Sequence, residues 1–223
     1  MKAKGQSFAV FDLDRTITRR STWRAFLDYA SKGPVSRGAS LLGEASAALR
    51  YALGQAEREE VKIAGLRARL AGRSRDELRA LAARFTEDVM QTGLRPYARQ
   101  AIEAERERGS CLVLATAAID LVADRFGQAL GFDHVVATEL SWNEDERLSP
   151  HLATPNCYGT EKERRVMGMI EQQGGTLDFM ASDHHTDLPL LTKAPRGLVV
   201  NPKPGFAQEA SGLGLEIADW ETP

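Results

Sequence analysis

The chain has 223 residues, of which 43% are hydrophobic and 27% charged, and its formal net charge is −2 at pH 7. This length and apolar content predict a soluble globular protein, either one large domain or a core with a smaller inserted domain. No apolar run approaches the roughly 18 residues of a membrane-spanning helix, so a membrane span is not expected.

Residues 1–6 read MKAKGQ and precede a strand rather than the apolar run of a secretory signal. The two cysteines, Cys111 and Cys157, have neither the spacing of metal ligands nor that of a disulfide framework. We therefore expect a reduced, cytoplasmic protein.

The first predicted element is a strand in the sequence FAVFDLDRTIT, residues 8–18. Phe8, Val10 and Phe11 are typical of a strand that is buried on both faces, as in a parallel sheet. Asp12 and Asp14 follow at once. Carboxylates at the end of a buried strand need a compensating partner.

Residues 18–92 show helical periodicity without a credible strand, with Ser21 as a candidate N-cap and an end near Gly93. Between Arg19 and Arg108, 18 Lys or Arg stand against 12 Asp or Glu. A basic segment can attract nucleic acid, anionic lipid or an anionic small substrate. Because acidic and basic residues are interleaved at helical spacing, we interpret the segment as solvent-exposed helices and expect no nucleic-acid partner.

Helices and strands alternate along the rest of the chain. The expected strands are residues 111–116, 134–138, 177–182 and 197–200, and the expected helices or helical turns are residues 96–109, 119–131, 159–175 and 187–191. This alternation predicts an α/β fold with a Rossmann-like, doubly wound parallel sheet. In such sheets, ligands bind at the carboxyl ends of the strands.

Polar side chains occur where several of these strands end. Thr116 ends one strand, Asp183 follows another, Asp187 lies four residues later, and Lys162 opens an intervening helix. We expect them to converge with the two aspartates of the first strand at one edge of the sheet. Several carboxylates in one cleft repel each other unless a hard divalent cation joins them, and oxygen ligands favour magnesium.

These residues resemble the motifs of a known family. FDLDRT is similar to the DxDxT motif of the haloacid dehalogenase superfamily of phosphatases, and SDHHTD is similar to its DxxxD motif. Thr116 and Lys162 match the two remaining motifs, in the same order. VVATEL and NCYGTEK resemble subgroup IB, related to phosphoserine phosphatase, whose helical cap is inserted after the first motif. The resemblance implies a core of residues 1–17 and 93–223 and an all-helical cap of residues 18–92.

The resemblance also implies magnesium-dependent hydrolysis of a small organic phosphate. Asp12 would attack phosphorus to form an aspartyl phosphate, and Asp14 would protonate the leaving alkoxide and later deprotonate the hydrolytic water. Thr116 and Lys162 would hold phosphoryl oxygens. The implied metal ligands are Asp12, the carbonyl of Asp14, Asp183 and, by ordering Lys162 or a metal-bound water, Asp187.

The sequence departs from the family pattern at Arg15, where glycine is usual, and at His184, where a small residue is usual. The turn into the cap must therefore accept a side chain. We interpret His184 and His185 as neighbours of the site rather than ligands. Trp23 and Phe26 fall on one face of a helix, which favours packing within the cap over contact with substrate.

Two alternative functions remain open. One is a phosphotransferase or phosphomutase with the same nucleophile, and the other is a non-enzymatic binding module that uses the basic helices. Dehalogenation is disfavoured, because Asp14 and the acidic metal site have no evident role with an alkyl halide.

Free phosphoserine is not expected to be the best substrate. Phosphoserine-specific relatives carry an acidic residue nine positions after the nucleophile, and Ser21 occupies this position here. A serine has no charge to pair with an ammonium group, and Arg19 and Arg20 would repel it. We therefore expect Arg19 and Arg20 to bind a monoester with additional negative charge or a larger organic group. The physiological substrate and the oligomeric state stay open.

Overall fold

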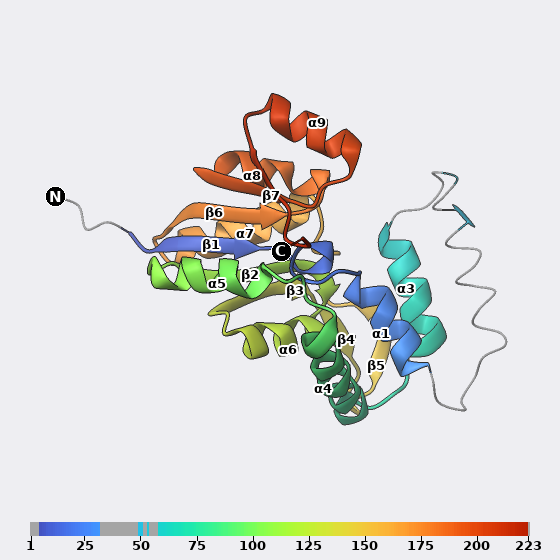
Figure 1. Cartoon of the computed structure of the whole chain (residues 1–223). Coiled ribbons are helices and arrows are strands. Elements are labelled where there is room, and N and C mark those ends of the chain that lie inside the picture. Colours follow the sequence, from blue (N-terminus) through green and yellow to red (C-terminus); the bar gives the residue numbers. More distant parts are fainter. Residues whose placement is uncertain (1–4, 32–48, 51–52, 54–57, 223) are drawn as a thin grey trace.

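The computed structural model describes residues 5–31, 49–50, 53 and 58–222 (Figure 1). Within these residues, six parallel strands form one sheet in the order β3-β2-β1-β6-β7-β8. The strands are β1 (Ser7–Phe11), β2 (Cys111–Ile119), β3 (His134–Thr138), β6 (Thr176–Ser182), β7 (Arg196–Val200) and β8 (Glu216–Ala218). The predicted parallel α/β sheet is confirmed, and the apolar strand β1 lies in its interior.

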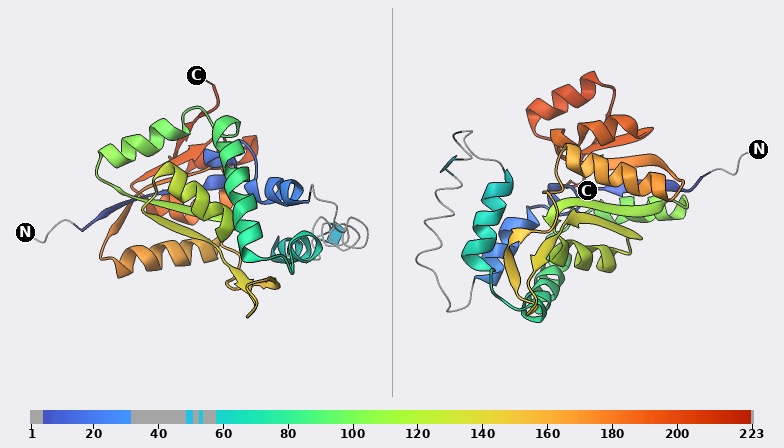
Figure 2. Two further views of the ribbon diagram at one scale, coloured as in Figure 1. Left: turned by 90° about the horizontal axis from the view of Figure 1, so that it is seen from below. Right: turned by 180° about the vertical axis from the view of Figure 1, so that it is seen from behind.

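Helices cover both faces of this sheet (Figures 1 and 2). Ala9 and Phe11 belong to the apolar cluster on the side of α5 and α6, whereas Phe8 and Val10 belong to the cluster on the side of α7, α8 and α9. Successive side chains of a strand point to opposite faces, so β1 is apolar at each of these positions because both faces are buried. The covering helices are α5 (Ala98–Glu107), α6 (Asp120–Leu130), α7 (Thr160–Gln172), α8 (Leu188–Lys193) and α9 (Pro204–Gly212).

The segment between β1 and α5 is helical where the structure describes it. Its elements are the turn η1 (Leu13–Ile17), α1 (Thr22–Ala30), α3 (Arg58–Arg69) and α4 (Arg75–Thr92). Figures 1 and 2 show α1, α3 and α4 grouped at the end of the sheet toward which β1 runs. Residues 32–48, 51–52 and 54–57 of the predicted cap lie outside the described residues. Of the described helices, none is long and apolar enough to cross a membrane.

The chain enters and leaves this helical segment through two stretches of backbone that lie side by side. Thr18 and Leu94 form an isolated antiparallel bridge. Beside it, the backbone N–H of Arg19 donates to the Gly93 carbonyl at 2.8 Å. The chain therefore enters and leaves the helical segment at one place.

A β-hairpin that the sequence pattern did not predict follows β3 (Figure 1). It consists of β4 (Leu140–Trp142) and β5 (Leu148–Leu152), which pair antiparallel. The Leu148 carbonyl accepts from the Gly72 N–H and the Leu148 N–H donates to the Arg73 carbonyl, both at 2.9 Å. The described elements of the predicted cap are helical as expected, and a hairpin from the segment after β3 pairs with the turn between α3 and α4.

Candidate active site

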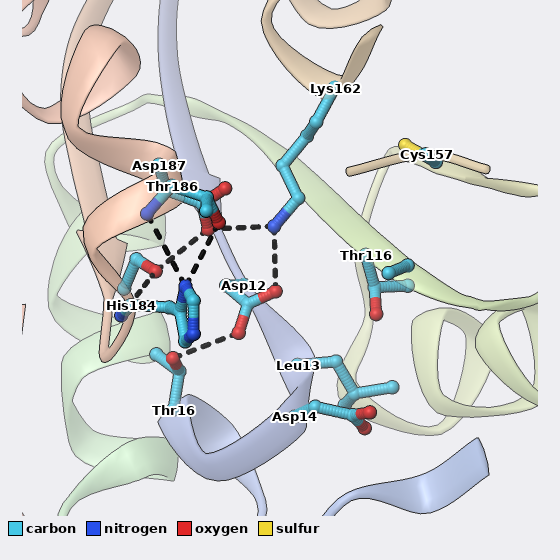
Figure 3. Close-up of polar contacts among 12 residues, drawn as sticks. Asp12, Leu13, Asp14, Thr16, Thr116, Cys157, Lys162, His184, Thr186 and Asp187 are labelled. Atoms are coloured by element: carbon cyan, nitrogen blue, oxygen red, sulfur yellow. Dashed lines mark hydrogen bonds and ion pairs between the residues drawn. The ribbon is translucent and has the colours of Figure 1, made fainter. Parts of the chain in front are cut away.

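Asp12 directly follows β1 at the carboxyl edge of the sheet (Figure 3). Its backbone N–H donates to the Ala181 carbonyl of the neighbouring strand β6 at 2.9 Å, and the residue is 6% exposed. The side-chain Oδ1 accepts from Lys162 Nζ at 2.8 Å, and Oδ2 accepts from Thr16 Oγ1 at 3.0 Å. Lys162 is thus the compensating partner that a carboxylate at the end of a buried strand requires.

Lys162 lies in the first turn of α7 and is 2% exposed. Its Nζ stands between two carboxylates, 2.8 Å from Asp12 Oδ1 and 2.7 Å from Asp187 Oδ2. Asp187 ends the short turn η2 (His185–Asp187) after β6. An ammonium is costly to bury unless it is paired with well-oriented charges. This pairing therefore places a permanent cation at the centre of the cluster.

Burial and charge shift the pKa values of this cluster in opposite directions. Burial raises the pKa of Asp12 to about 7, with Lys162 opposing the shift and the neighbouring aspartates adding to it. Burial also raises the pKa of Asp183 to about 6, with Arg15 opposing the shift. Burial alone would lower the pKa of Lys162, but Asp12 and Asp187 outweigh it and hold that pKa above its ordinary value. The ammonium therefore keeps its proton, whereas the pKa values of Asp12 and Asp183 lie above that of an ordinary aspartate.

Thr16 and Ser182 complete the cluster, and sequence reasoning assigned neither of them to the site. Thr16 Oγ1 lies 3.0 Å from Asp12 Oδ2 and 3.4 Å from Asp183 Oδ1, and it accepts from the Asp183 N–H at 2.9 Å. Ser182 Oγ donates to Asp187 Oδ2 at 2.7 Å. Two sequence features could have indicated them, namely the position of Thr16 in DLDRT and the position of Ser182 directly before Asp183. The two hydroxyls orient three carboxylates.

The donor atoms of this cluster fit a hard divalent cation. Asp12 and Asp183 both approach the single Thr16 hydroxyl, and Asp187 Oδ1 is buried without a hydrogen-bond partner among the described residues. A metal-bound water would satisfy such an orphaned oxygen. In the described part of the chain, no three His, Cys, Asp or Glu side chains form a metal site by themselves. A cation here would depend on two carboxylates, the Asp14 carbonyl and water, and Mg²⁺ commonly keeps several waters.

Asp14 lies in η1, and its carboxylate is held by the beginning of α1. Its Oδ1 accepts from Thr22 N at 2.8 Å and from Thr22 Oγ1 at 2.6 Å, and its Oδ2 accepts from Ser21 Oγ at 2.9 Å. Ser21 occupies the N-cap position as predicted, but its own side chain does not cap the helix. Instead, the Asp14 carboxylate accepts a hydrogen bond from the first backbone N–H of the helix. Figure 3 shows this carboxylate pointing away from Lys162.

Arg15 has a φ of 67°, in the left-handed region that favours glycine. A side chain in this conformation costs about 1–2 kcal/mol. The carbonyl of Arg15 accepts from Arg95 Nε at 2.8 Å, which helps to hold the turn. The departure from glycine that the sequence shows is therefore accompanied by backbone strain next to Asp14.

Thr116 lies inside β2 and is fully buried. The prediction that it ends the strand was wrong, because β2 continues to Ile119 with an irregular register after Ala115. Thr116 Oγ1 accepts from the Ala118 N–H at 3.0 Å. A hydroxyl that accepts in this way still has its own proton to donate, so Thr116 can bind a phosphoryl oxygen.

A cavity of about 190 Å³ lies beside Asp14, between the helical segment and the core. Its lining includes Asp14, Ser21, Trp23, Lys62, Asn156 and Tyr158. Trp23 therefore lines the cavity in addition to packing within the cap, whereas Phe26 is fully buried as predicted. Lys62, which the sequence analysis did not single out, lies 5.7 Å from the centroid of the Trp23 ring. A larger cavity, of about 520 Å³, surrounds the beginning of β7, at the opposite end of the sheet from Asp12.

Arg19 and Arg20 are exposed and do not line the smaller cavity. Arg19 Nε pairs with Glu221 at 2.7 Å, and its Nη1 donates to the Thr92 carbonyl at 2.9 Å. The expectation that these two arginines bind substrate finds no support in this geometry. Among the described residues that line the smaller cavity, the cation is Lys62.

His184 and His185 lie between Asp183 and Asp187 in the chain, and their rings contact each other. The ring centroids are 4.4 Å apart, and His184 Nδ1 lies 2.9 Å from Thr186 Oγ1. The His184 backbone N–H donates to Ser182 Oγ at 3.2 Å. The pair therefore packs beside the carboxylate cluster, on the side of η2.

Known proteins are similar to this chain in sequence or in fold. The family model of haloacid dehalogenase-like hydrolases matches residues 9–192. A probable phosphatase of Mycobacterium tuberculosis is 27% identical over 227 residues, which cover 99% of this chain and 77% of that protein. The crystal structure of a protein of unknown function from Bordetella pertussis Tohama I is 25% identical, with a TM-score of 0.83 and coverage of 97% and 100%. A substrate-bound phosphoserine phosphatase complex shares the fold, with a TM-score of 0.66, 15% identity and coverage of 99% and 96%.

Proposed function

Because this chain belongs to the haloacid dehalogenase-like hydrolase family, we propose that it is a magnesium-dependent phosphate monoester hydrolase with Asp12 as nucleophile. The observation that carries the proposal is the buried contact of Lys162 Nζ with Asp12 at 2.8 Å and with Asp187 at 2.7 Å. This contact places a carboxylate that can act as a nucleophile beside a permanent cation that can bind an anionic phosphoryl group. Phosphoryl transfer needs this combination of an aligned nucleophile and neutralised oxygens.

In the proposed reaction, a carboxylate oxygen of Asp12 attacks phosphorus, and the bond from phosphorus to the leaving oxygen breaks. Asp14 donates its proton to the leaving alkoxide. Water then attacks the phosphorus of the aspartyl phosphate, Asp14 accepts a proton from this water, and inorganic phosphate leaves. Lys162 and the Thr116 hydroxyl hold the non-bridging oxygens. Mg²⁺, held by Asp12, Asp183 and the Asp14 carbonyl, would supply charge neutralisation at the phosphoryl group.

The leaving group is proposed to occupy the cavity beside Asp14. Its volume of about 190 Å³ is somewhat larger than the ~150 Å³ of a protein cavity that binds benzene. The cavity therefore suits an alcohol of about the size of one ring. Trp23 offers an apolar surface, and the hydrogen-bonded pair of Lys62 and Asn156 places a positive charge beside it. The proposed substrate class is a small organic phosphate monoester.

Free phosphoserine remains, in this proposal, a poor substrate. Ser21 uses its hydroxyl to bind Asp14 Oδ2 and supplies no negative charge. Lys62 in the cavity lining would repel the ammonium group of phosphoserine and would attract an additional anionic group instead. This argument replaces the one from Arg19 and Arg20.

The proposal is tested by hydrolysis of p-nitrophenyl phosphate by the full chain, with Mg²⁺ and with excess chelator. We expect Mg²⁺-dependent turnover that falls by about 10³-fold or more in Asp12→Asn, because an amide is a poor nucleophile. The matched control is Asp145→Asn, which alters an exposed aspartate of the hairpin and should leave turnover unchanged. Rapid quenching and mass spectrometry should find the phosphoryl group on Asp12. Full activity in Asp12→Asn, or turnover that ignores the chelator, would contradict the proposal.

A further inference from the structure

Lys62 is a buried cation through which the helical segment contacts the core. It extends from α3 and is 5% exposed. Its Nζ donates to the Ala117 carbonyl and to Asn156 Oδ1, and it lies 3.3 Å from Thr138 Oγ1. The three oxygens belong to β2, to the loop before α7 and to the last residue of β3. The ammonium therefore gathers three separate segments of the core around one side chain of the cap.

The Ala117 carbonyl belongs to the peptide unit that orients Thr116. The same unit contains the Ala118 N–H, which donates to Thr116 Oγ1 at 3.0 Å. Because the peptide bond is planar, holding the direction of the carbonyl also holds the direction of the N–H. Thr138 Oγ1 donates to this carbonyl as well, at 3.0 Å. Lys62 and Thr138 thus bind the carbonyl of a peptide unit whose N–H orients the Thr116 hydroxyl.

We propose that Lys62 is a positioning residue, which orients the Thr116 hydroxyl through the Ala117–Ala118 peptide and so makes the phosphoryl site depend on contact between cap and core. The inference rests on the proposed function for one point, the binding of a phosphoryl oxygen by Thr116. A second contact of α3 points the same way, since Glu59 Oε2 accepts from the Asn156 N–H at 2.9 Å. When α3 leaves the core, the Ala117 carbonyl loses its charged donor and the hydroxyl loses its fixed orientation.

A double-mutant cycle tests this role, with calorimetric binding of inorganic phosphate to the full chain in Mg²⁺ as the readout. Lys62→Met removes the ammonium and keeps an unbranched apolar side chain, and Thr116→Val removes the hydroxyl and keeps its shape. We expect each variant to raise the Kd of phosphate about tenfold, and the double variant to bind within about twofold of the single ones. The matched control is Lys193→Met, an exposed lysine paired with Glu163, which should leave the Kd unchanged.

Additive effects, with the Kd of the double variant raised about a hundredfold, would overturn the inference, and so would an unchanged Kd in Lys62→Met. If Lys62→Met does not fold, Thr138→Val takes its place in the cycle with the same expectation, because it removes the other donor to the Ala117 carbonyl. The readout is binding rather than turnover. A chain that shows the coupling but hydrolyses no ester would therefore refute the proposed function alone, whereas a chain that binds no phosphate would refute both.

Discussion

Binding of Mg²⁺ to the carboxylate cluster is expected to release protons near pH 6. Burial raises the pKa of Asp12 to about 7, against the opposing charge of Lys162, and raises the pKa of Asp183 to about 6. A divalent cation between these carboxylates favours their ionised forms. The protons that they carry without metal must therefore leave when Mg²⁺ binds.

The two pKa values set the size of the effect. At pH 6, Asp12 with a pKa of about 7 is roughly nine-tenths protonated, and Asp183 with a pKa of about 6 is roughly half protonated. Both carboxylates approach the Thr16 hydroxyl, so they titrate as a pair, and we expect about one proton released per Mg²⁺. At pH 8 the release should fall below about 0.2 protons, and the affinity for Mg²⁺ should be about tenfold higher than at pH 6.

Calorimetric titration of the full chain with Mg²⁺, in two buffers of different ionisation enthalpy, measures the number of protons released. Asp12→Asn should lose most of the release at pH 6, because it removes the carboxyl group with the higher pKa. Asp145→Asn, which alters an exposed aspartate, should match the unmodified chain. Tight Mg²⁺ binding at pH 6 without proton release, or equal affinity at pH 6 and pH 8, would refute the reasoning.

Three further predictions concern charge and strain at the site. Arg15→Gly should raise the free energy of unfolding in urea by about 1 kcal/mol, because it relieves the backbone strain at φ 67°. The same change should move the Mg²⁺-linked proton release to higher pH, because the charge of Arg15 opposes the raised pKa of Asp183. An unshifted release profile would contradict the second effect. Lys162→Met should lower the free energy of unfolding by about 3–5 kcal/mol at pH 8, because it leaves two buried carboxylates without their cation. The loss should be smaller at pH 5, where Asp12, whose pKa burial raises to about 7, takes up a proton; a loss independent of pH would count against this pairing. Phosphoserine should have a lower kcat/KM than 3-phosphoglycerate, which carries a hydroxyl in place of the ammonium group. A kcat/KM about tenfold higher for phosphoserine, a difference of about 1.4 kcal/mol in transition-state binding, would refute the charge argument.

The sheet and the carboxylate cluster could be predicted from the sequence because their signals are local. A strand such as FAVF is apolar at each position only when both of its faces are buried, and the ends of parallel strands meet at one edge. The hairpin of β4 and β5 had no such signal. Its strands are three and five residues long, and one of them contains Pro150. Its strand β5 also pairs with the turn between α3 and α4, and local periodicity does not reveal such a tertiary contact.

The residues that the sequence analysis missed act through tertiary contacts. Lys62 belongs to a helix with interleaved charges, where a lysine is normally solvated, and only the packing of α3 against the core buries it. Arg19 is the converse case, because its nearness to the nucleophile in the chain suggested a substrate contact, whereas its side chain pairs with Glu221 in the structure. Charge near a motif in sequence is therefore weaker evidence than charge in the lining of the cavity.

Burial and an excess of negative charge together connect the raised pKa values, the orphaned oxygen and the proposed cation. Asp12, Asp183 and Asp187 bring three negative charges when ionised, and the Lys162 ammonium contacts only two of them. Burial first, and the neighbouring aspartates second, raise the pKa of Asp12, but a protonated Asp12 is a poor nucleophile. A divalent cation relieves the excess and keeps Asp12 ionised. The acid limb of the pH dependence of kcat/KM should therefore move to lower pH as the Mg²⁺ concentration is raised. An acid limb that stays in place would contradict the argument that the metal keeps Asp12 ionised.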